Sequence, residues 1–247
     1  MRRIYFLLLI AIVTLNLQAC KKNSPLNPQT KIYLLYRLTF ISSNSKTIQE
    51  YSYDSKNRLT ETNINANANK VKYVYIYDNQ DKLIKVEYYT NDNLYTTQTY
   101  SYVSGAINIT EKYSDGSTFN KAFELTGNRV TRYFNYNLNE TTTYFYDAKG
   151  NISSLYITNM VYSGTWSYTY DDKKHPFSMI GAPNPHLFFL EQPAAAYSNI
   201  NNAISSTLGA NEINDYIYNG DGFPVRVVTH DIDNRYSYTV TYEYIVR

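Results

Sequence analysis

The sequence of 247 residues contains a single cysteine and almost no excess charge of either sign. One thiol excludes an internal disulfide, so a fold of this size must be held together by its hydrophobic core. The chain has 23 Lys and Arg against 21 Asp and Glu. Removal of Arg2 and Arg3 with a signal segment that has no acid leaves 21 of each, which is a net charge of zero. Such a chain lacks the basic field that attracts nucleic acid, and we expect no nucleic-acid partner.

Long hydrophobic runs are also scarce, and one stands near the start of the chain. The ten apolar residues 4–13 have the length of a secretory signal core and are too few to cross a bilayer as a helix. The following "LNLQAC" resembles the bacterial lipoprotein signal, with Leu17 at −3 and Ala19 at −1 of Cys20. The resemblance implies that residues 1–19 are removed and that Cys20 becomes an acylated N-terminus. A plain signal peptide with an unrelated cysteine is the alternative.

A polar segment with two prolines, "KKNSPLNPQTK", follows the cysteine. We expect it to be a flexible tether between the lipid and the folded part. The membrane, reached through the anchor at Cys20, is then a predicted partner. The expected location is the cell envelope, in the outer membrane with the leaflet left open. The predicted parts of the chain are a signal peptide at 1–19, the lipidated cysteine and tether at 20–31, and one β domain at 32–247.

Tyrosine, in contrast, is abundant, with 29 residues. Many of them fall in Tyr-x-Tyr units whose second aromatic position recurs at a nearly fixed spacing. The steps are 21 to 25 residues, apart from one step of 48 that spans two periods. A fixed period of this size marks a repeat architecture. The recurring positions are Tyr53, Tyr77, Tyr102, Leu125, Tyr146, Tyr170, Tyr218 and finally Tyr242 or Tyr244.

Each repeat has the pattern of a β-hairpin. The Tyr-x-Tyr alternation favours a strand with both rings on one face. The units at Asp54, Asp78, Asp147 and Asp171 continue with an Asp, whose side chain can bond its own backbone two residues on and start a turn. Two strands per period give roughly sixteen strands with short antiparallel connections. The sequence therefore predicts an all-β fold, a long antiparallel meander of about 24-residue hairpin repeats curled into an open or closed barrel-like sheet.

The repeat resembles the YD repeats of Rhs-type envelope and toxin proteins, in which a similar Tyr-Asp turn recurs. It departs from them after the turn, because only "YDAKGNI" has the usual glycine. A closer resemblance is to a group of lipoproteins of unknown function, common in Bacteroidota, that have Tyr-Asp hairpin repeats and a curled, porin-like sheet. "YTYDDKKHPFSMI" at residues 168–180 is similar to a recurrent segment of that group. The resemblance covers nearly the whole mature chain and implies a fold and a compartment, but no catalytic residues.

The tyrosine alternation stops in an irregular insertion at residues 173–214, which holds four of the seven prolines. A helix is predicted there from Pro193, which suits a first turn, to Gly209, which suits a C-terminal cap. Its apolar stripe needs a partner, and we expect it to pack with Phe188 or Phe189 on the concave face of the sheet. The stripe consists of Tyr197, Ile200, Ile204 and Leu208.

Motifs of catalysis and of metal binding are missing. His175, His186 and His230 do not have the spacing of a zinc site, and the chain has no nucleophile elbow, phosphate loop or dinucleotide fingerprint. The repeated Asp residues are typical of turns, because a catalytic pair is needed once and a turn residue is needed in every unit. We therefore expect a protein that is not an enzyme and that has no cofactor and no metal site.

The candidate ligand contacts are Trp166, Tyr168 and Tyr170, which alternate along one predicted strand beside the insertion. Aromatic faces can stack on sugar rings, and a break in a regular repeat is where a unique concavity is expected. The plainer interpretation is that these rings pack within the sheet.

The sequence thus predicts a non-enzymatic cell-envelope lipoprotein that binds glycan or another extended ligand. A structural or assembly subunit of an envelope protein complex is the alternative. An integral outer-membrane barrel is a third hypothesis, disfavoured because Asn, Thr and Lys occur on both faces of the predicted strands.

Overall fold

The computed structural model describes residues 31–66, 69–127, 129–178, 200–207 and 211–247. Within it, Tyr33–Arg247 form one compact unit. In this described part of the chain, no helix has the length and apolar character needed to span a membrane.

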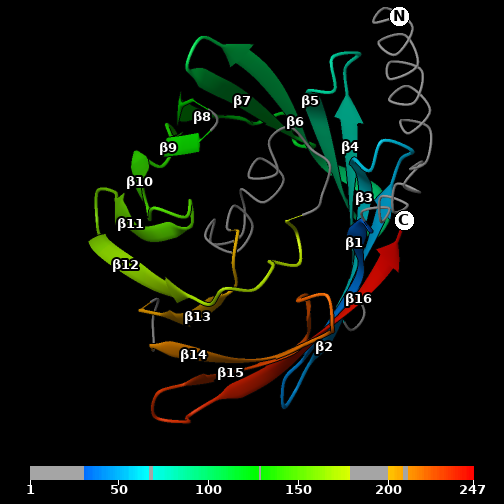
Figure 1. The fold of residues 1–247 in the computed structure, drawn as a ribbon. Helices are drawn as coiled ribbons and strands as arrows, with labels where there is room; N and C mark the ends of the chain where they lie inside the picture. The colour runs from blue at the N-terminus through cyan, green and yellow to red at the C-terminus, as the bar shows by residue number, and fades with distance from the viewer. Residues whose placement is uncertain (1–30, 67–68, 128, 179–199, 208–210) are drawn as a thin grey trace, which may run out of the picture. The chain divides into compact units, whose positions relative to one another are not determined.

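The described residues form a closed barrel of sixteen strands in chain order, in which every neighbouring pair is antiparallel (Figure 1). The predicted all-β meander and its strand number are confirmed, and the sheet closes instead of staying open. The strands are β1 (Tyr33–Ile41), β2 (Lys46–Tyr53), β3 (Leu59–Ala66), β4 (Asn69–Tyr77), β5 (Leu83–Thr90), β6 (Asn93–Val103), β7 (Ala106–Tyr113), β8 (Thr118–Thr126), β9 (Arg129–Asn135), β10 (Glu140–Tyr146), β11 (Ile152–Thr158), β12 (Ser163–Tyr170), β13 (Ala203–Ser206), β14 (Glu212–Tyr218), β15 (Pro224–Asp231) and β16 (Ser237–Val246).

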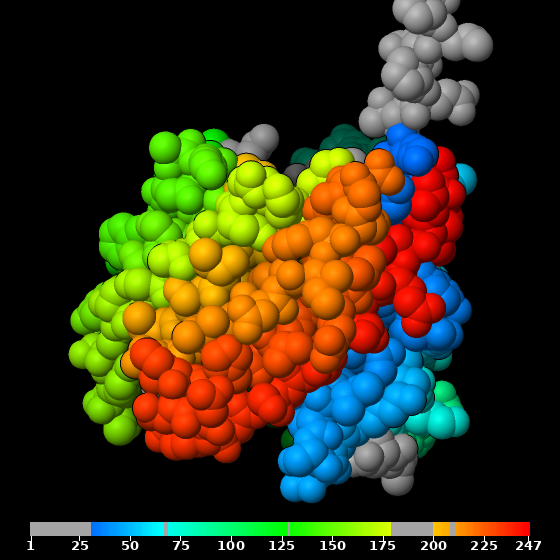
Figure 2. Space-filling model, turned by 60° about the horizontal axis from the view of Figure 1, so that its bottom comes forward, coloured from blue at the N-terminus to red at the C-terminus, as the bar shows by residue number. Residues whose placement is uncertain are grey.

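The barrel is closed by the first and last strands. Leu38 of β1 lies opposite Tyr242 of β16, and Phe40 lies opposite Val240. Figure 2 shows this seam on the outer surface, where red β16 lies against blue β1. The connections that follow the even-numbered strands, such as β2 and β4, lie at one end of the barrel, which we call the turn end. We call the opposite end the far end. Tyr33 and Val246, which begin β1 and end β16, both lie at the turn end.

The turn end is built from the predicted Asp turns. The Asp54 carboxylate accepts hydrogen bonds from the backbone N–H groups of Lys56 and Arg58, both at 2.9 Å. Asn57 has a φ of 62°, a left-handed conformation that Asn, Asp and Gly tolerate best. The same arrangement recurs at Asp78 and Asp147, with Asp81 and Gly150 in the left-handed position. The predicted turn role of the repeated Asp residues is confirmed.

In six of the units, the recurring tyrosine links one Asp-turn hairpin to the preceding one. Its hydroxyl donates to a carbonyl near the start of the immediately preceding strand, over 2.6 to 2.8 Å. Burial raises the pKa of Tyr102 and Tyr146 to about 12, so these hydroxyls stay protonated donors. The donor and acceptor pairs are Tyr53–Leu35, Tyr77–Leu59, Tyr102–Leu83, Tyr146–Val130, Tyr170–Ile152 and Tyr244–Pro224.

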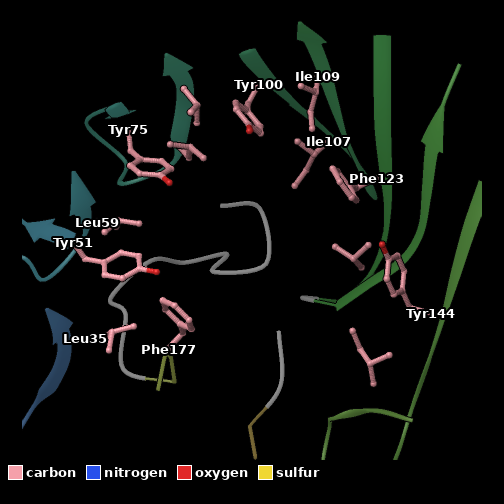
Figure 3. Packing of buried hydrophobic residues seen from close by; sticks show 14 of the residues in the cluster. Leu35, Tyr51, Leu59, Tyr75, Tyr100, Ile107, Ile109, Phe123, Tyr144 and Phe177 are labelled. Atoms are coloured by element: carbon pink, nitrogen blue, oxygen red, sulfur yellow. The ribbon is translucent and has the colours of Figure 1, made fainter. Parts of the chain in front are cut away.

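The two faces of the barrel wall differ in polarity. Val86 of β5 belongs to the buried hydrophobic cluster inside, whereas its neighbours Lys85 and Glu87 form an ion pair at 2.8 Å outside. On β1 and β2, Arg37 pairs with Glu50 at 2.7 Å on the outer face. Figure 3 shows the cluster facing the interior from around the barrel, with Leu35, Tyr51, Leu59, Tyr75, Tyr100, Ile107, Ile109, Phe123, Tyr144 and Phe177 labelled.

The predicted helix at 193–209 is wrong where the structure describes it. Ala203–Ser206 form β13, which pairs with β12 and β14. Ile200 and Ile204, predicted to be buried in a helical stripe, are 51% and 38% exposed. The physical reason is that these residues complete the backbone hydrogen bonding between β12 and β14, and such pairing overrides a weak helical pattern. The remaining stripe residues, Tyr197 and Leu208, and the partners Phe188 and Phe189 lie outside the described residues.

The irregular segment is shorter than the predicted insertion at 173–214. It is the connection from β12 to β13, because strands resume at Ala203 and β14 begins at Glu212. Its described beginning enters the barrel. Phe177 is 4% exposed and its ring meets that of Tyr51 edge-on, with centroids 5.5 Å apart (Figure 3). For Phe177, the predicted packing of the insertion on the concave face is confirmed.

Candidate functional site

The three predicted contact residues lie in one row on the inner face of β12. Trp166, Tyr168 and Tyr170 are each half-buried, and they alternate with the exposed residues Ser167 and Thr169. Trp166 and Tyr168 pack against the interior hydrophobic cluster. The shared face predicted from the alternation is confirmed, while a ligand contact stays a prediction.

A fourth ring extends the row toward the far end, and sequence reasoning did not include it. Tyr162 stacks on Trp166 with centroids 6.2 Å apart and an angle of 22° between the rings. Gly164 lies between them, and a Cβ there would be 1.9 Å from the Tyr162 hydroxyl oxygen. The missing side chain of Gly164 therefore leaves room for the Tyr162 ring. The sequence did contain a signal for this fourth ring, because a glycine between two aromatic residues in an alternating strand leaves space for one of the rings.

Two hydroxyls without a partner lie beside this row. Tyr168 is opposite Ser206 of β13 in the strand register. The Tyr168 hydroxyl and Ser206 Oγ are buried, and no described residue forms a hydrogen bond with either. Burial raises the pKa of Tyr168 to about 12, which keeps its hydroxyl protonated. A buried polar group without a partner costs about 1–3 kcal/mol, so a ligand hydroxyl that bonds here would recover part of that cost.

A cavity of about 200 Å³ lies between the beginning of the insertion and the inner wall formed by β13 to β16 and β1. This volume is below the range of about 300–1,000 Å³ that is typical of pockets for whole small molecules, so it suits one part of a larger ligand. The described residues that line it are Leu38, His175, Pro176, Phe177, Ala203, Asn214, Tyr216, Val227, Thr229, Tyr238, Val240 and Tyr242.

The histidines have different surroundings. His175 borders the cavity, and its Nδ1 accepts a hydrogen bond from the Phe177 backbone N–H at 3.3 Å. Burial lowers the pKa of His175 to about 3, so the ring is neutral at physiological pH. His230 Nε2 lies 3.3 Å from Asp215 Oδ2, and His186 lies outside the described residues. Within the described ranges, no group of three or more His, Cys, Asp or Glu side chains could hold a metal ion.

A buried polar clamp fixes the border of the site. Asn151 is fully buried, and its Oδ1 accepts hydrogen bonds from the backbone N–H groups of Ile200 and Asn201, each at 2.9 Å. Asp171, at the other stem of the insertion, accepts the Asn202 backbone N–H at 3.0 Å and a hydrogen bond from a tyrosine of β14. The clamp therefore holds the start and the end of the insertion against the β10–β11 turn.

Among the comparisons with known proteins, the one with solved structures finds similar chains. No protein-family model and no curated protein matches the chain. Among solved structures, it is similar to a porin-like protein from Bacteroides uniformis, with a TM-score of 0.40 and 12% identity over 85% of this chain and 98% of that one. A porin-like protein from Bacteroides vulgatus gives a TM-score of 0.42 and 12% identity over 86% and 99%. Both of these structural neighbours are thus porin-like proteins. The closed barrel of this chain is defined by its own strand pairing.

Proposed function

We propose that the protein is a non-enzymatic, lipid-anchored binding protein of the cell envelope, whose barrel takes a glycan or a similar extended ligand on the inner face of β12. One observation carries this proposal. The Trp166–Tyr168 row faces the interior next to two buried hydroxyls, of Tyr168 and Ser206, that have no described partner.

The chemistry of this wall matches a sugar. An aromatic face covers the apolar C–H side of a sugar ring, and a tyrosine or serine hydroxyl can bond the hydroxyls at its rim. Trp166 and Tyr168 offer the faces, and Tyr168 and Ser206 offer the hydroxyls. A purely apolar ligand would leave those hydroxyls without partners.

The signal at Cys20 and the outer wall support the proposed location. The mid-strand ion pairs Arg37–Glu50 and Lys85–Glu87 lie on the outer face, where a lipid-facing barrel would carry apolar side chains. This polarity supports a barrel in water that is tied to the membrane by its lipid. Metabolic labelling with a fatty-acid analogue should mark the wild type and not Cys20→Ala, and equal labelling of both would contradict the anchor.

The ligand proposal is tested by a binding screen. The mature chain carrying Cys20→Ala is offered to an array of envelope and host glycans, and each hit is titrated while the emission of Trp166 is followed. Because Trp166 is the chain's only tryptophan, its emission reports on this wall alone. A bound glycan should shift the emission, whereas no binding to any glycan would contradict the proposal.

One observation favours the assembly alternative. Three connections at the far end and the adjoining ends of β1 and β6 carry exposed apolar side chains, and such surfaces often mark protein contacts. If the protein is an assembly subunit, polar substitution of Met160 and Val161 should abolish cross-linking to a specific envelope protein in cells without changing glycan binding. The exposed apolar residues at this end are Ile41, Leu94, Tyr95, Tyr136, Leu138, Met160, Val161, Tyr162, Ile232 and Tyr236.

A further inference from the structure

Two arginines occupy the same place in two repeats. The Arg58 guanidinium lies over the ring of Tyr77, with 4.5 Å between the guanidinium carbon and the ring centroid. The Arg129 guanidinium lies over the ring of Tyr146 at 5.2 Å. In both repeats the tyrosine hydroxyl donates to the carbonyl of the residue that follows the arginine. The two arginines therefore hold corresponding places over the tyrosine, although the segment from Leu125 to Arg129 is one residue shorter than that from Tyr53 to Arg58.

At Arg58 the guanidinium is neutralised by two carboxylates. Its Nε lies 2.6 Å from Asp54 Oδ2, and its Nη1 lies 2.6 Å from Asp81 Oδ1. Asp54 comes from the turn before Arg58, where it directly follows Tyr53 of the repeat. Asp81 occupies the left-handed position of the next Asp turn, with a φ of 64°.

At Arg129 both carboxylates are missing. Thr126 follows Leu125 as Asp54 follows Tyr53, but it ends β8 and pairs with Arg129 three residues later, whereas Asp54 lies in a turn four residues before Arg58. Gly150 occupies the left-handed position that Asp81 has. The Arg129 guanidinium reaches over this glycine, since a Cβ on Gly150 would lie 2.9 Å from Arg129 Nη2. Arg129 is exposed and forms no ion pair with any carboxylate of the described residues.

A pocket lies beside the Arg129 guanidinium. This pocket of about 620 Å³ at the turn end is bordered by Arg129 and Tyr146, within the range of about 300–1,000 Å³ that is typical of small-molecule sites. Arg129 is the one charged residue among its described lining residues, which are Thr126, Gly127, Arg129, Thr131 and Tyr146.

We propose that this pocket binds a ligand carboxylate through Arg129, in the role that the Asp54 and Asp81 carboxylates have at Arg58. The planar guanidinium offers paired N–H donors that match a carboxylate. The Tyr146 ring beneath it holds the guanidinium in place and leaves its edge directed to the ligand. The inference does not rest on the glycan site at β12, because it uses other residues and another kind of interaction.

The test follows the side-chain Nε–Hε NMR signals of the arginines in the mature chain carrying Cys20→Ala. D-glucuronate is the probe, its methyl ester is the neutral control, and inorganic phosphate is a second anion. Glucuronate should shift the Arg129 signal saturably and leave the Arg58 signal unchanged, because Arg58 is already paired. The methyl ester should have no effect, and phosphate should bind more weakly than glucuronate.

Three variants complete the design. Arg129→Gln should weaken glucuronate binding at least about tenfold, because a hydrogen bond to a charged group is lost. Thr126→Asp should also weaken it, because the new carboxylate takes the place of the ligand. Arg58→Gln, the matched control in the equivalent position, should bind as the wild type does, and melting curves check that each variant is folded.

Several outcomes would overturn the inference. They are an unmoved Arg129 signal at saturating glucuronate, equal shifts of Arg58 and Arg129, and unchanged affinity in folded Arg129→Gln. Tighter binding of phosphate than of glucuronate would overturn the assignment to a carboxylate.

Discussion

At the scale of single residues, the recurring tyrosine has a specific reason to be tyrosine. Its ring packs inside the barrel, and its hydroxyl bonds a backbone carbonyl of the preceding hairpin. Phenylalanine would supply the ring and leave that carbonyl without this donor. The period in the sequence is therefore the period of a hydrogen bond, from a tyrosine hydroxyl to a backbone carbonyl, that joins a hairpin to the one before it in six of the units.

Tyr77→Phe tests this interaction. Removing the hydroxyl that bonds the Leu59 carbonyl at 2.8 Å should lower the free energy of unfolding by about 1 kcal/mol. The measurement is denaturant unfolding. Tyr89→Phe is the control, because its hydroxyl bonds Glu87 at 2.9 Å on the outer face and its loss should cost less than about 0.5 kcal/mol. Equal effects of the two substitutions would contradict a structural role of the inner hydroxyls.

Glu111 gives a prediction about pH. It is 1% exposed inside the barrel, 2.8 Å from Lys121 Nζ. Burial by itself would raise the pKa of Glu111, but the hydrogen bonds from Lys121 and Gln98 outweigh it and hold the pKa below the ordinary 4.5. A depressed carboxylate pKa contributes stability above the unfolded pKa, and this contribution is lost as the pH falls through the folded value.

Glu111→Gln should therefore destabilise the protein at pH 7 by about 3 kcal/mol or more, because Lys121 is left buried and unpaired. Below pH 4.5, the stability of this variant should fall less steeply than that of the wild type, because the variant has no Glu111 carboxylate to protonate. Glu124→Gln, in the exposed pair with Arg132, is the control and should change stability by less than about 1 kcal/mol. Unfolding measured from pH 3 to pH 7 would contradict this account if both variants had the same profile as the wild type.

At the scale of elements, the clamp around Asn151 positions the insertion. Asn151→Ala leaves the partly buried N–H of Ile200 and the buried N–H of Asn201 without an acceptor and should cost about 2 kcal/mol or more. Hydrogen exchange of those two amides should speed up with it. Asn159→Ala is a matched control, because Asn159 Oδ1 also accepts two backbone N–H groups at 2.9 Å, in an exposed turn. If the two variants lost equal stability, the clamp would have no special role.

Elements with a local signal were predictable, and β13 was not. The Asp turns were predictable because an Asp side chain bonds the backbone of the residues that follow it. The whole signal therefore lies within a few neighbouring residues of the sequence. Ala203–Ser206 contain no such signal, and their strand depends on β12 and β14, which pair with them on either side. The site shows the same limit. Alternation placed Trp166, Tyr168 and Tyr170 on one face, but Ser206 joined them only through a pairing with a segment that looked helical.

At the scale of the molecule, the number of strands followed from the repeat, but closure did not. The contact between Leu38 and Tyr242 joins residues at opposite ends of the sequence, and no local pattern predicts it. Once closed, the barrel has a Tyr-rich, largely apolar interior and ion pairs on its outer wall. Ion pairs in mid-strand are unusual on a lipid-facing wall, and the arrangement supports the proposal that a ligand binds inside.

The central claim is that the inner face of β12 binds a glycan, and calorimetric titration of a glycan hit tests it most directly. Trp166→Ala should weaken binding by about 1 kcal/mol or more if the ring is an anchor. Tyr156→Ala removes a 39% exposed ring from the outer face of the neighbouring strand β11 and should leave the affinity unchanged. Affinity that survives Trp166→Ala in a folded protein, or that falls equally in both variants, would contradict the claim.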